Sequence, residues 1–216
     1  MPLSPAVNIP SLASRLADGV TALDLDVTAD VQARLLAFVE LLEKWNRSYN
    51  LTAVRDPEQM IARHILDSLA VAPYVHGTRV ADLGSGAGLP GIPLALVAPQ
   101  REFVLLDSNA KKTRFITEAV GALNIKNVTV VQERAEKYRP AQPFDTVIAR
   151  AFASIGEFIA CAEHLCRDDG RFLAMKGVYP AEELAAIPAG YRAESVAALS
   201  VPGLDAARHL AIIVRA

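Results

Sequence analysis

The stretch Val80-Ala81-Asp82-Leu83-Gly84-Ser85-Gly86-Ala87-Gly88-Leu89-Pro90-Gly91 decides the fold, because an apolar run ends at an acid and then turns through alternate glycines. A second apolar run, residues 103–107, also ends in an acid, Asp107. Glycines have no Cβ, so they permit a tight turn and a close approach of the backbone to a ligand. The pattern predicts a nucleotide-type cofactor at the edge of a parallel sheet, with Gly84, Ser85 and Gly86 in its binding loop.

The spacing of this loop separates two classes of cofactor. A dinucleotide fingerprint requires a third glycine at the position of Leu89, which counts against an NAD-dependent dehydrogenase. S-adenosylmethionine (SAM) has a ribose and an adenine but no pyrophosphate, so the spacing favours SAM. Leu89 is a further candidate cofactor-binding residue. Asp107 follows about 20 residues downstream, where a carboxylate accepts hydrogen bonds from ribose hydroxyls. A purely structural glycine turn would leave this second acid unexplained.

Composition and charge limit the number of domains and the class of substrate. The chain has 216 residues, is 52% hydrophobic and carries a formal charge of −2, which suits one domain with a small extension. Residues 78–150 hold ten Lys and Arg against seven Asp and Glu, so positive charge gathers in the segment with the glycine loop. This local excess permits a polyanionic substrate without requiring one.

The cysteines and the first residues bear on the cellular compartment. Cys161 and Cys166 fall in one predicted helix without zinc-like or redox spacing, so we expect thiols in or near the core and no metal. A chain without a disulfide framework suits a reducing cytoplasm. The opening residues lack a secretory pattern and no apolar run is long enough to span a bilayer, so we expect a cytoplasmic protein without membrane association.

Two patterns divide the chain. Residues 1–77 predict helices: a short one around 12–17, a strong one capped by Thr28, and one that starts at Asp56-Pro57 and ends at Pro73. Beyond residue 78, strands alternate with helices, which predicts a parallel sheet covered on both faces. The expected strands are 79–83, 103–107, 127–132, 144–149 and 171–176. The expected helices are 91–98, 110–123, 155–166 and 180–187. An antiparallel pair of strands, 192–201 and 208–215, joined through Pro202-Gly203, ends the chain. We therefore expect an N-terminal helical extension, 1–77, and a cofactor-binding domain, 78–216, which form one compact unit.

Several segments, in order, resemble the bacterial RsmG (GidB) family of 16S rRNA methyltransferases. They are Lys44-Trp45-Asn46, Tyr49-Asn50-Leu51-Thr52, Arg63-His64-Ile65-Leu66-Asp67-Ser68, the glycine loop, Leu106-Asp107-Ser108 with Lys111-Lys112, Arg150-Ala151-Phe152-Ala153-Ser154, Leu173-Ala174-Met175-Lys176-Gly177 and Arg208-His209-Leu210. The resemblance runs from about residue 28 to the end. It implies an α/β, Rossmann-like class I SAM-dependent methyltransferase fold, whose seven-stranded sheet is mostly parallel with an antiparallel last strand.

The resemblance also implies an activity: methylation by SAM of N7 of guanosine 527, in the 530 loop of 16S rRNA in the small ribosomal subunit. Two other classes stay open, a SAM methyltransferase acting on a small molecule or protein, and a non-catalytic SAM- or RNA-binding module. The match at residues 208–210 counts against the first, and the intact glycine loop counts against the second. Because the chain is net acidic, we expect a structured ribonucleoprotein as substrate rather than naked RNA. Nothing in the sequence argues against a monomer, which is the expected oligomeric state.

Candidate catalytic residues end two expected strands, at the carboxyl edge where such sheets bind ligands. Arg150 is positioned to hold either the methionine carboxylate or the O6/N7 edge of guanine. Lys176 is a candidate for contact with the target base or an RNA phosphate. Ala135 and Glu136 follow the third strand, where this fold contacts adenine.

Further basic residues are candidate RNA contacts. Lys111 and Lys112 open the helix after Asp107 together with Arg114, and cations there oppose the helix dipole, which favours an external anion. Plain solvation of the three side chains explains them equally well. Arg134 and Arg208 are further candidates. We expect His64 and Asp67, three residues apart on one helix, to form a structural hydrogen-bonded pair.

Overall fold

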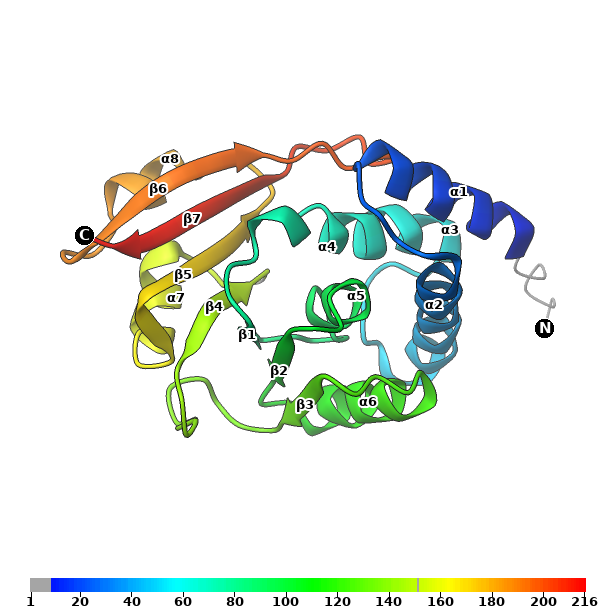
Figure 1. The fold of residues 1–216 in the computed structure, drawn as a ribbon, viewed down its shortest axis with the longest axis horizontal. Helices are drawn as coiled ribbons and strands as arrows, with labels where there is room; N and C mark the ends of the chain where they lie inside the picture. The colour runs from blue at the N-terminus through cyan, green and yellow to red at the C-terminus, as the bar shows by residue number, and fades with distance from the viewer. Residues whose placement is uncertain (1–8, 151) are drawn as a thin grey trace.

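A seven-stranded sheet organises the computed structural model, which describes residues 9–150 and 152–216 (Figure 1). The strand order is β3-β2-β1-β4-β5-β7-β6, and β7 runs antiparallel to both of its neighbours while β1 to β5 run parallel. The strands are β1 (Arg79–Leu83), β2 (Glu102–Leu106), β3 (Val128–Val131), β4 (Phe144–Ala149), β5 (Cys166–Lys176), β6 (Tyr191–Ala198) and β7 (His209–Arg215). The expected mixed sheet with an antiparallel last strand is confirmed.

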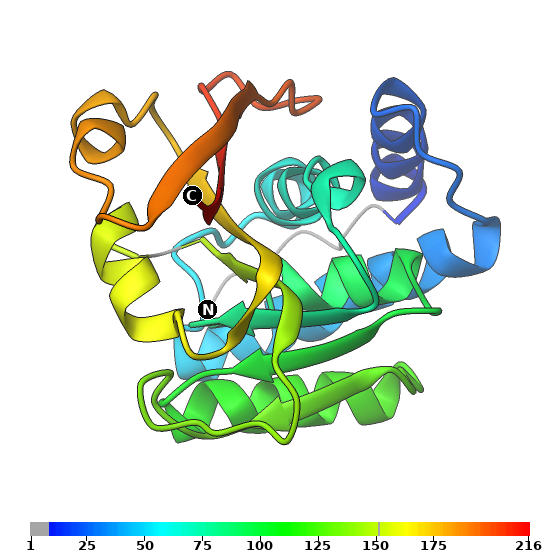
Figure 2. The ribbon, with the colours of Figure 1, turned by 60° about the vertical axis from the view of Figure 1, so that its left-hand side comes forward.

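Helices cover both faces of this sheet, as Figure 2 shows. One face carries α1 (Ile9–Ala22), α2 (Ala29–Tyr49), α5 (Gly91–Val97) and α6 (Ala110–Ala122), together with the consecutive short segments α3 (Pro57–Met60), the π-helix η1 (Ile61–Leu66) and α4 (Asp67–Leu69). A 3-10 turn, η2 (Ala72–Tyr74), leads into β1. The other face carries α7 (Ile155–Ala162) and α8 (Ala181–Ala185).

Strand residues alternate between two hydrophobic clusters, as the period of a strand requires. Val80 and Phe103 pack into the cluster under the N-terminal helices, whereas their neighbours Ala81 and Val104 pack into the cluster under α7. Both faces of the sheet are therefore buried, which is typical of parallel strands. The first cluster also contains Leu35 of α2, so N-terminal helices and sheet share apolar contacts. The predicted division into an N-terminal helical extension, 1–77, and a cofactor-binding domain, 78–216, stays a prediction.

The predicted helix caps are present. The Thr28 side chain accepts a hydrogen bond from the Val31 amide at the start of α2, and the Asp56 side chain accepts one from the Glu58 amide at the start of α3. Each cap satisfies one amide that has no partner within its helix. Among the described residues, no helix has the length and hydropathy to cross a bilayer.

Several expected helix and strand bounds are wrong. The helix expected to reach Pro73 is interrupted by the π-helix η1 and ends at Leu69, and the strand expected over 192–201 ends at Ala198. The first helix, α1, has 14 residues instead of the short helix expected around 12–17, because Leu12, Leu16 and Val20 recur every four residues and are buried in the core. The helix expected over 155–166 ends at Ala162, and Cys166 opens β5 opposite Phe144. The strand starts earlier than expected because a register shift accommodates the polar residues that follow Cys166. Cys166 is a core thiol, and burial raises its pKa to about 12.

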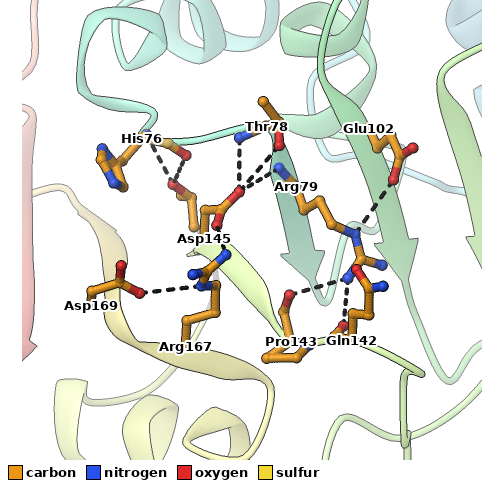
Figure 3. A network of polar contacts seen from close by, with 10 residues as sticks. His76, Thr78, Arg79, Glu102, Gln142, Pro143, Asp145, Arg167 and Asp169 are labelled. Carbon is orange, nitrogen blue, oxygen red and sulfur yellow. Dashed lines mark hydrogen bonds and ion pairs between the residues drawn. The ribbon is translucent and has the colours of Figure 1, made fainter.

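A polar network ties the amino ends of β1 and β4 together, on the edge opposite the glycine loop (Figure 3). Asp145 accepts hydrogen bonds from the backbone amides of Thr78 and Arg79 at 2.8 and 2.9 Å, and its other oxygen lies 3.3 Å from Arg167. Although partial burial opposes the shift, the two amides and Arg167 hold the pKa of Asp145 below its ordinary value. The network fixes where β4 begins beside β1, and so which residues reach the opposite edge.

Candidate active site

The glycine loop follows β1 at the point where the strand order reverses, with β2 on one side and β4 on the other. Open α/β sheets bind ligands at such a switch point. Gly84 and Gly86 have φ angles of 66° and 59°, a conformation that side chains with a Cβ disfavour. The amides of Gly84 and Ser85 donate to the carbonyl of Leu106 at 2.8 and 3.1 Å. These bonds fasten the loop to the end of β2.

Asp107, just beyond β2, lies against this loop. One carboxylate oxygen accepts a hydrogen bond from the Gly86 amide at 2.9 Å, and the other accepts one from the Asn109 amide at 2.8 Å. The Lys112 ammonium lies 3.7 Å from the first oxygen. Residues 84–86 and Asp107, predicted to share a cofactor, are therefore brought together, with Lys112 beside them.

Asp82 was not among the predicted site residues, although an acid at the end of an apolar strand is a visible signal. Its side chain is fully buried below the glycine loop, and Oδ2 accepts a hydrogen bond from the Gly91 amide at 2.9 Å. Oδ1 has no hydrogen-bond partner among the described residues. Burial raises the pKa of Asp82 to about 7, although the Gly91 amide and the charge of Arg150 oppose the shift.

This pKa makes the stability of the fold depend on pH through Asp82. Because the folded-state pKa lies near 7 and the ordinary value is 3.8, the folded protein keeps a proton between pH 4 and 7 that the unfolded chain releases. The stabilisation is thus present at low pH and lost as the pH rises through 7. We expect wild-type protein to lose about 2–3 kcal/mol relative to Asp82→Asn between pH 5 and pH 8. Urea unfolding of both proteins at both pH values measures this, and a pH-independent difference would contradict it.

A second group of predicted residues meets in a pocket of about 340 Å³, at the carboxyl ends of β4 and β5. Arg150, Lys176 and Arg208 line this cationic pocket together with Arg63 and Asp67. Asp67, with only 3% of its side chain exposed, accepts a hydrogen bond from Arg208 Nε at 2.8 Å and lies 3.7 Å from Arg150 Nη1. Burial lowers the pKa of Arg150, and the charges of Asp67 and Asp82 oppose this shift.

Lys176 is tied into the wall of the cationic pocket. Its ammonium lies 2.7 Å from Glu183 Oε2 on α8 and donates to the carbonyl of Phe152 at 3.4 Å. The same Glu183 oxygen accepts a hydrogen bond from the Ile155 amide at the start of α7. The side chain of Lys176 is 12% exposed, so its ammonium is held by these contacts more than by solvent.

The expected pair of His64 and Asp67 is not formed. His64 Nδ1 lies 2.9 Å from the Arg63 carbonyl, which can only accept, so Nδ1 carries the proton and Nε2 accepts from the Thr52 hydroxyl at 2.9 Å. Burial and the charge of Arg150 lower the pKa of His64 to about 4. His64 is therefore neutral near pH 7 with both nitrogens engaged, while Asp67 faces the two arginines. Spacing on the helix could not predict these contacts, because Thr52, which binds His64, and Arg208, which binds Asp67, lie in other segments.

The remaining predicted residues lie elsewhere. Lys111 is exposed in the first turn of α6, which Asn109 caps. Arg134 and Glu136 are exposed in a turn after β3, and Ala135 between them packs against the second hydrophobic cluster. Glu136 accepts a hydrogen bond from the thiol of Cys161 at 3.4 Å. Within the described ranges, no group of three His, Cys, Asp or Glu side chains is placed to hold a metal; the expectation of a metal-free site stays a prediction.

Comparison with known proteins places the chain among its relatives. Residues 31–211 match the sequence model of the GidB family, described as rRNA small subunit methyltransferase G. A "Ribosomal RNA small subunit methyltransferase G" of Nitrosospira multiformis is 50% identical, over 94% of this chain and 98% of the relative. The protein of the same name from Nitrosococcus oceani is 52% identical, over 90% of this chain and 91% of the relative.

Solved structures of other methyltransferases share the fold of this chain. The O-methyltransferase TomG from Streptomyces achromogenes superimposes with a TM-score of 0.59 at 17% identity, covering 92% of this chain and 96% of that chain. A SAM-dependent methyltransferase from Aquifex aeolicus gives 0.57 at 18% identity, covering 72% and 93%. The fold is that of the class I SAM-dependent methyltransferases. By the sequence match over most of its length, the chain belongs to the GidB family, rRNA small subunit methyltransferase G.

Proposed function

We propose that this protein transfers a methyl group from SAM to N7 of guanosine 527 in the 530 loop of 16S rRNA. The observation that carries the proposal is the pairing of two sites at one edge of the sheet. Asp107 lies against the glycine loop at the β1/β2 edge. The cationic pocket lies beside it, at the ends of β4 and β5. A cofactor site next to a site for a polyanion is what methylation of an RNA requires.

The residues near the loop fit SAM. A Cβ built on Gly84 would meet no atom within 4 Å, so the backbone there is open to close approach by a ligand. The oxygens of Asp107 are aligned by two backbone amides, which suits a carboxylate that accepts from ribose hydroxyls. Gly84, Ser85, Gly86, Leu89 and Asp107 would hold the cofactor, with the Ala135 amide and the Glu136 carboxylate at its adenine. When bound, SAM supplies a methyl group on a positively charged sulfur.

Methylation of guanine N7 does not require general acid–base catalysis by the protein. Guanine N7 offers a lone pair and has no proton to lose, so no general base is needed. His64 suits this requirement, because both of its ring nitrogens are already hydrogen-bonded. The contribution of the chain is then to align the base and exclude water. We assign Arg150 to the methionine carboxylate or to the guanine O6/N7 edge, and Lys176 to the base or its phosphate.

The RNA contacts proposed for Lys111, Lys112, Arg134 and Arg208 are too few for tight binding of naked RNA by a chain of net charge −2. We therefore propose a structured ribonucleoprotein, the small ribosomal subunit or an assembly intermediate, as the substrate of a monomeric enzyme.

Mapping of the methylated nucleotide tests the activity directly. Purified protein and SAM are mixed with small subunits that lack the modification, and with naked 16S rRNA in parallel. The RNA is then mapped for 7-methylguanosine by chemical strand scission. We expect one new site in the 530 loop, formed faster on subunits than on naked RNA. Absence of a new mark, or a mark outside this loop, would show that the assigned substrate is wrong.

A further inference from the structure

The cationic pocket carries more positive charge than its internal partners balance. Four cationic side chains line it: Arg63, Arg150, Lys176 and Arg208. Among the described residues of the lining, the one acid is Asp67, and Glu183 lies behind Lys176 as its ion-pair partner. These two carboxylates, and buried Asp82, whose charge acts on Arg150 from behind the pocket, stand against four cations, which leaves an excess of at least one positive charge. Like charges gathered without an anion repel one another, so the arrangement favours an anionic ligand.

Of the four cations in the pocket, Arg63 is the one to which the proposed function gives no role. It lies on η1, its side chain is exposed, and within the described ranges it makes no side-chain hydrogen bond or ion pair. By contrast, Arg208 is held by Asp67 and Lys176 by Glu183. A free guanidinium has all five of its donors available for an external oxyanion.

Asp67 holds two of the other cations in place. Its buried carboxylate connects Arg150, at the end of β4, with Arg208, just before β7. One carboxylate shared by two guanidiniums fixes their positions and leaves most of their donors unused. Asp67 thus acts as a positioning residue for an anion, and a preorganised pair of donors loses little entropy on binding.

We propose that the cationic pocket binds one backbone phosphate of the RNA, with Arg63 as a direct contact and Asp67 as the positioning residue. The site rests on the proposed function and extends it, since it brings the N-terminal helical segment into substrate binding. The methionine carboxylate of SAM is the other anion within reach. The pocket lining contains no residue of the glycine loop and not Asp107, and it extends instead toward Gly177 and Arg208. This position favours the phosphate.

Equilibrium binding tests the site without need of turnover. Fluorescently labelled protein is titrated with unmethylated small subunits at several KCl concentrations, and SAM affinity is measured by calorimetry. We expect Arg63→Gln to raise Kd for subunits about five- to tenfold at low salt. The slope of log Kd against log salt should fall by about 0.7–0.9, as for one lost phosphate contact. SAM affinity should stay unchanged.

Arg192→Gln is the matched control. Arg192 is exposed on β6 and, within the described ranges, forms no ion pair. It lies beside Val214, at the end of the hairpin away from Lys176. It should bind subunits as wild type does. Asp67→Asn should also weaken subunit binding, by releasing Arg150 and Arg208, with its melting temperature as a check of folding.

Three results would overturn the phosphate site: unchanged Kd and salt slope in Arg63→Gln, a loss of SAM affinity with an unchanged salt slope, or no binding of subunits by wild type. The second of these would assign the pocket to the cofactor carboxylate. A wild-type protein that binds subunits through Arg63 but leaves no methyl mark would instead contradict the proposed function alone.

Discussion

Asp107→Ala is expected to lower the affinity for SAM by about a hundredfold or more. A hydrogen bond to a charged acceptor contributes about 1.5–3 kcal/mol, and two ribose hydroxyls would lose their acceptor together. The carboxylate also holds the Gly86 and Asn109 amides, so its removal loosens the loop that it faces. Isothermal titration calorimetry with SAM measures the loss, and thermal unfolding without ligand reports the effect on the fold.

Two further variants separate binding from folding in this experiment. Asp107→Asn keeps a carbonyl oxygen that can accept from the Asn109 amide while removing the charge, so it should fold well and still bind SAM weakly. Asp168→Asn changes a carboxylate with 93% of its side chain exposed and should leave SAM affinity unchanged. Wild-type affinity in Asp107→Ala would show that the ribose assignment is wrong.

Features encoded in short segments could be predicted from the sequence. The strands expected at 79–83 and 144–149 have those bounds in the structure, because each is a short segment in which most residues are apolar. The glycine loop and Asp107 meet because parallel neighbours end at the same edge, and β1 pairs in register with β2 from Arg79 to Leu83. Local pattern and sheet geometry together were enough to place the cofactor loop.

The partners of charged residues could not be predicted in the same way. Asp67 and Arg208 are separated by 141 positions and meet only after β7 inserts between β5 and β6. Spacing on one helix suggested His64 as the partner of Asp67, but His64 lies in the π-helix η1 and Asp67 opens α4, and the two side chains bind different segments. The free guanidinium of Arg63 has no signal in the sequence, because an unpaired cation is defined by what surrounds it in space.

Arg150 and Asp67 form a partly buried ion pair, in which the side chains are 29% and 3% exposed. The Arg150 side chain lies 3.7 Å from Asp67, and the charge of a second buried acid, Asp82, also acts on it. Desolvation of such a group is repaid only when its partners are well placed. A guanidinium held there at the end of β4, beside the glycine loop, is ready to take a planar ligand without reorganisation.

Arg150→Gln is therefore expected to reduce kcat/KM for the small subunit by about a hundredfold, the order of one lost bidentate contact in a preorganised site. Arg150→Lys should recover only part of this, because an ammonium keeps the charge but not the two parallel donors. The protein should stay folded, since Arg208 Nε still donates to Asp67 at 2.8 Å. Steady-state methylation kinetics with subunits, SAM calorimetry and thermal unfolding give the three quantities needed.

The two roles proposed for Arg150 predict different effects of the substitution on SAM affinity and on the steps that involve the RNA. If Arg150 holds the methionine carboxylate, the Kd for SAM rises along with the fall in kcat/KM. If it holds the O6/N7 edge of guanine, SAM affinity stays at the wild-type value and the loss is confined to steps that involve the RNA. A third outcome, unchanged kinetics and unchanged SAM affinity, would remove Arg150 from the site and leave it as a structural counter-ion of Asp67 and Asp82.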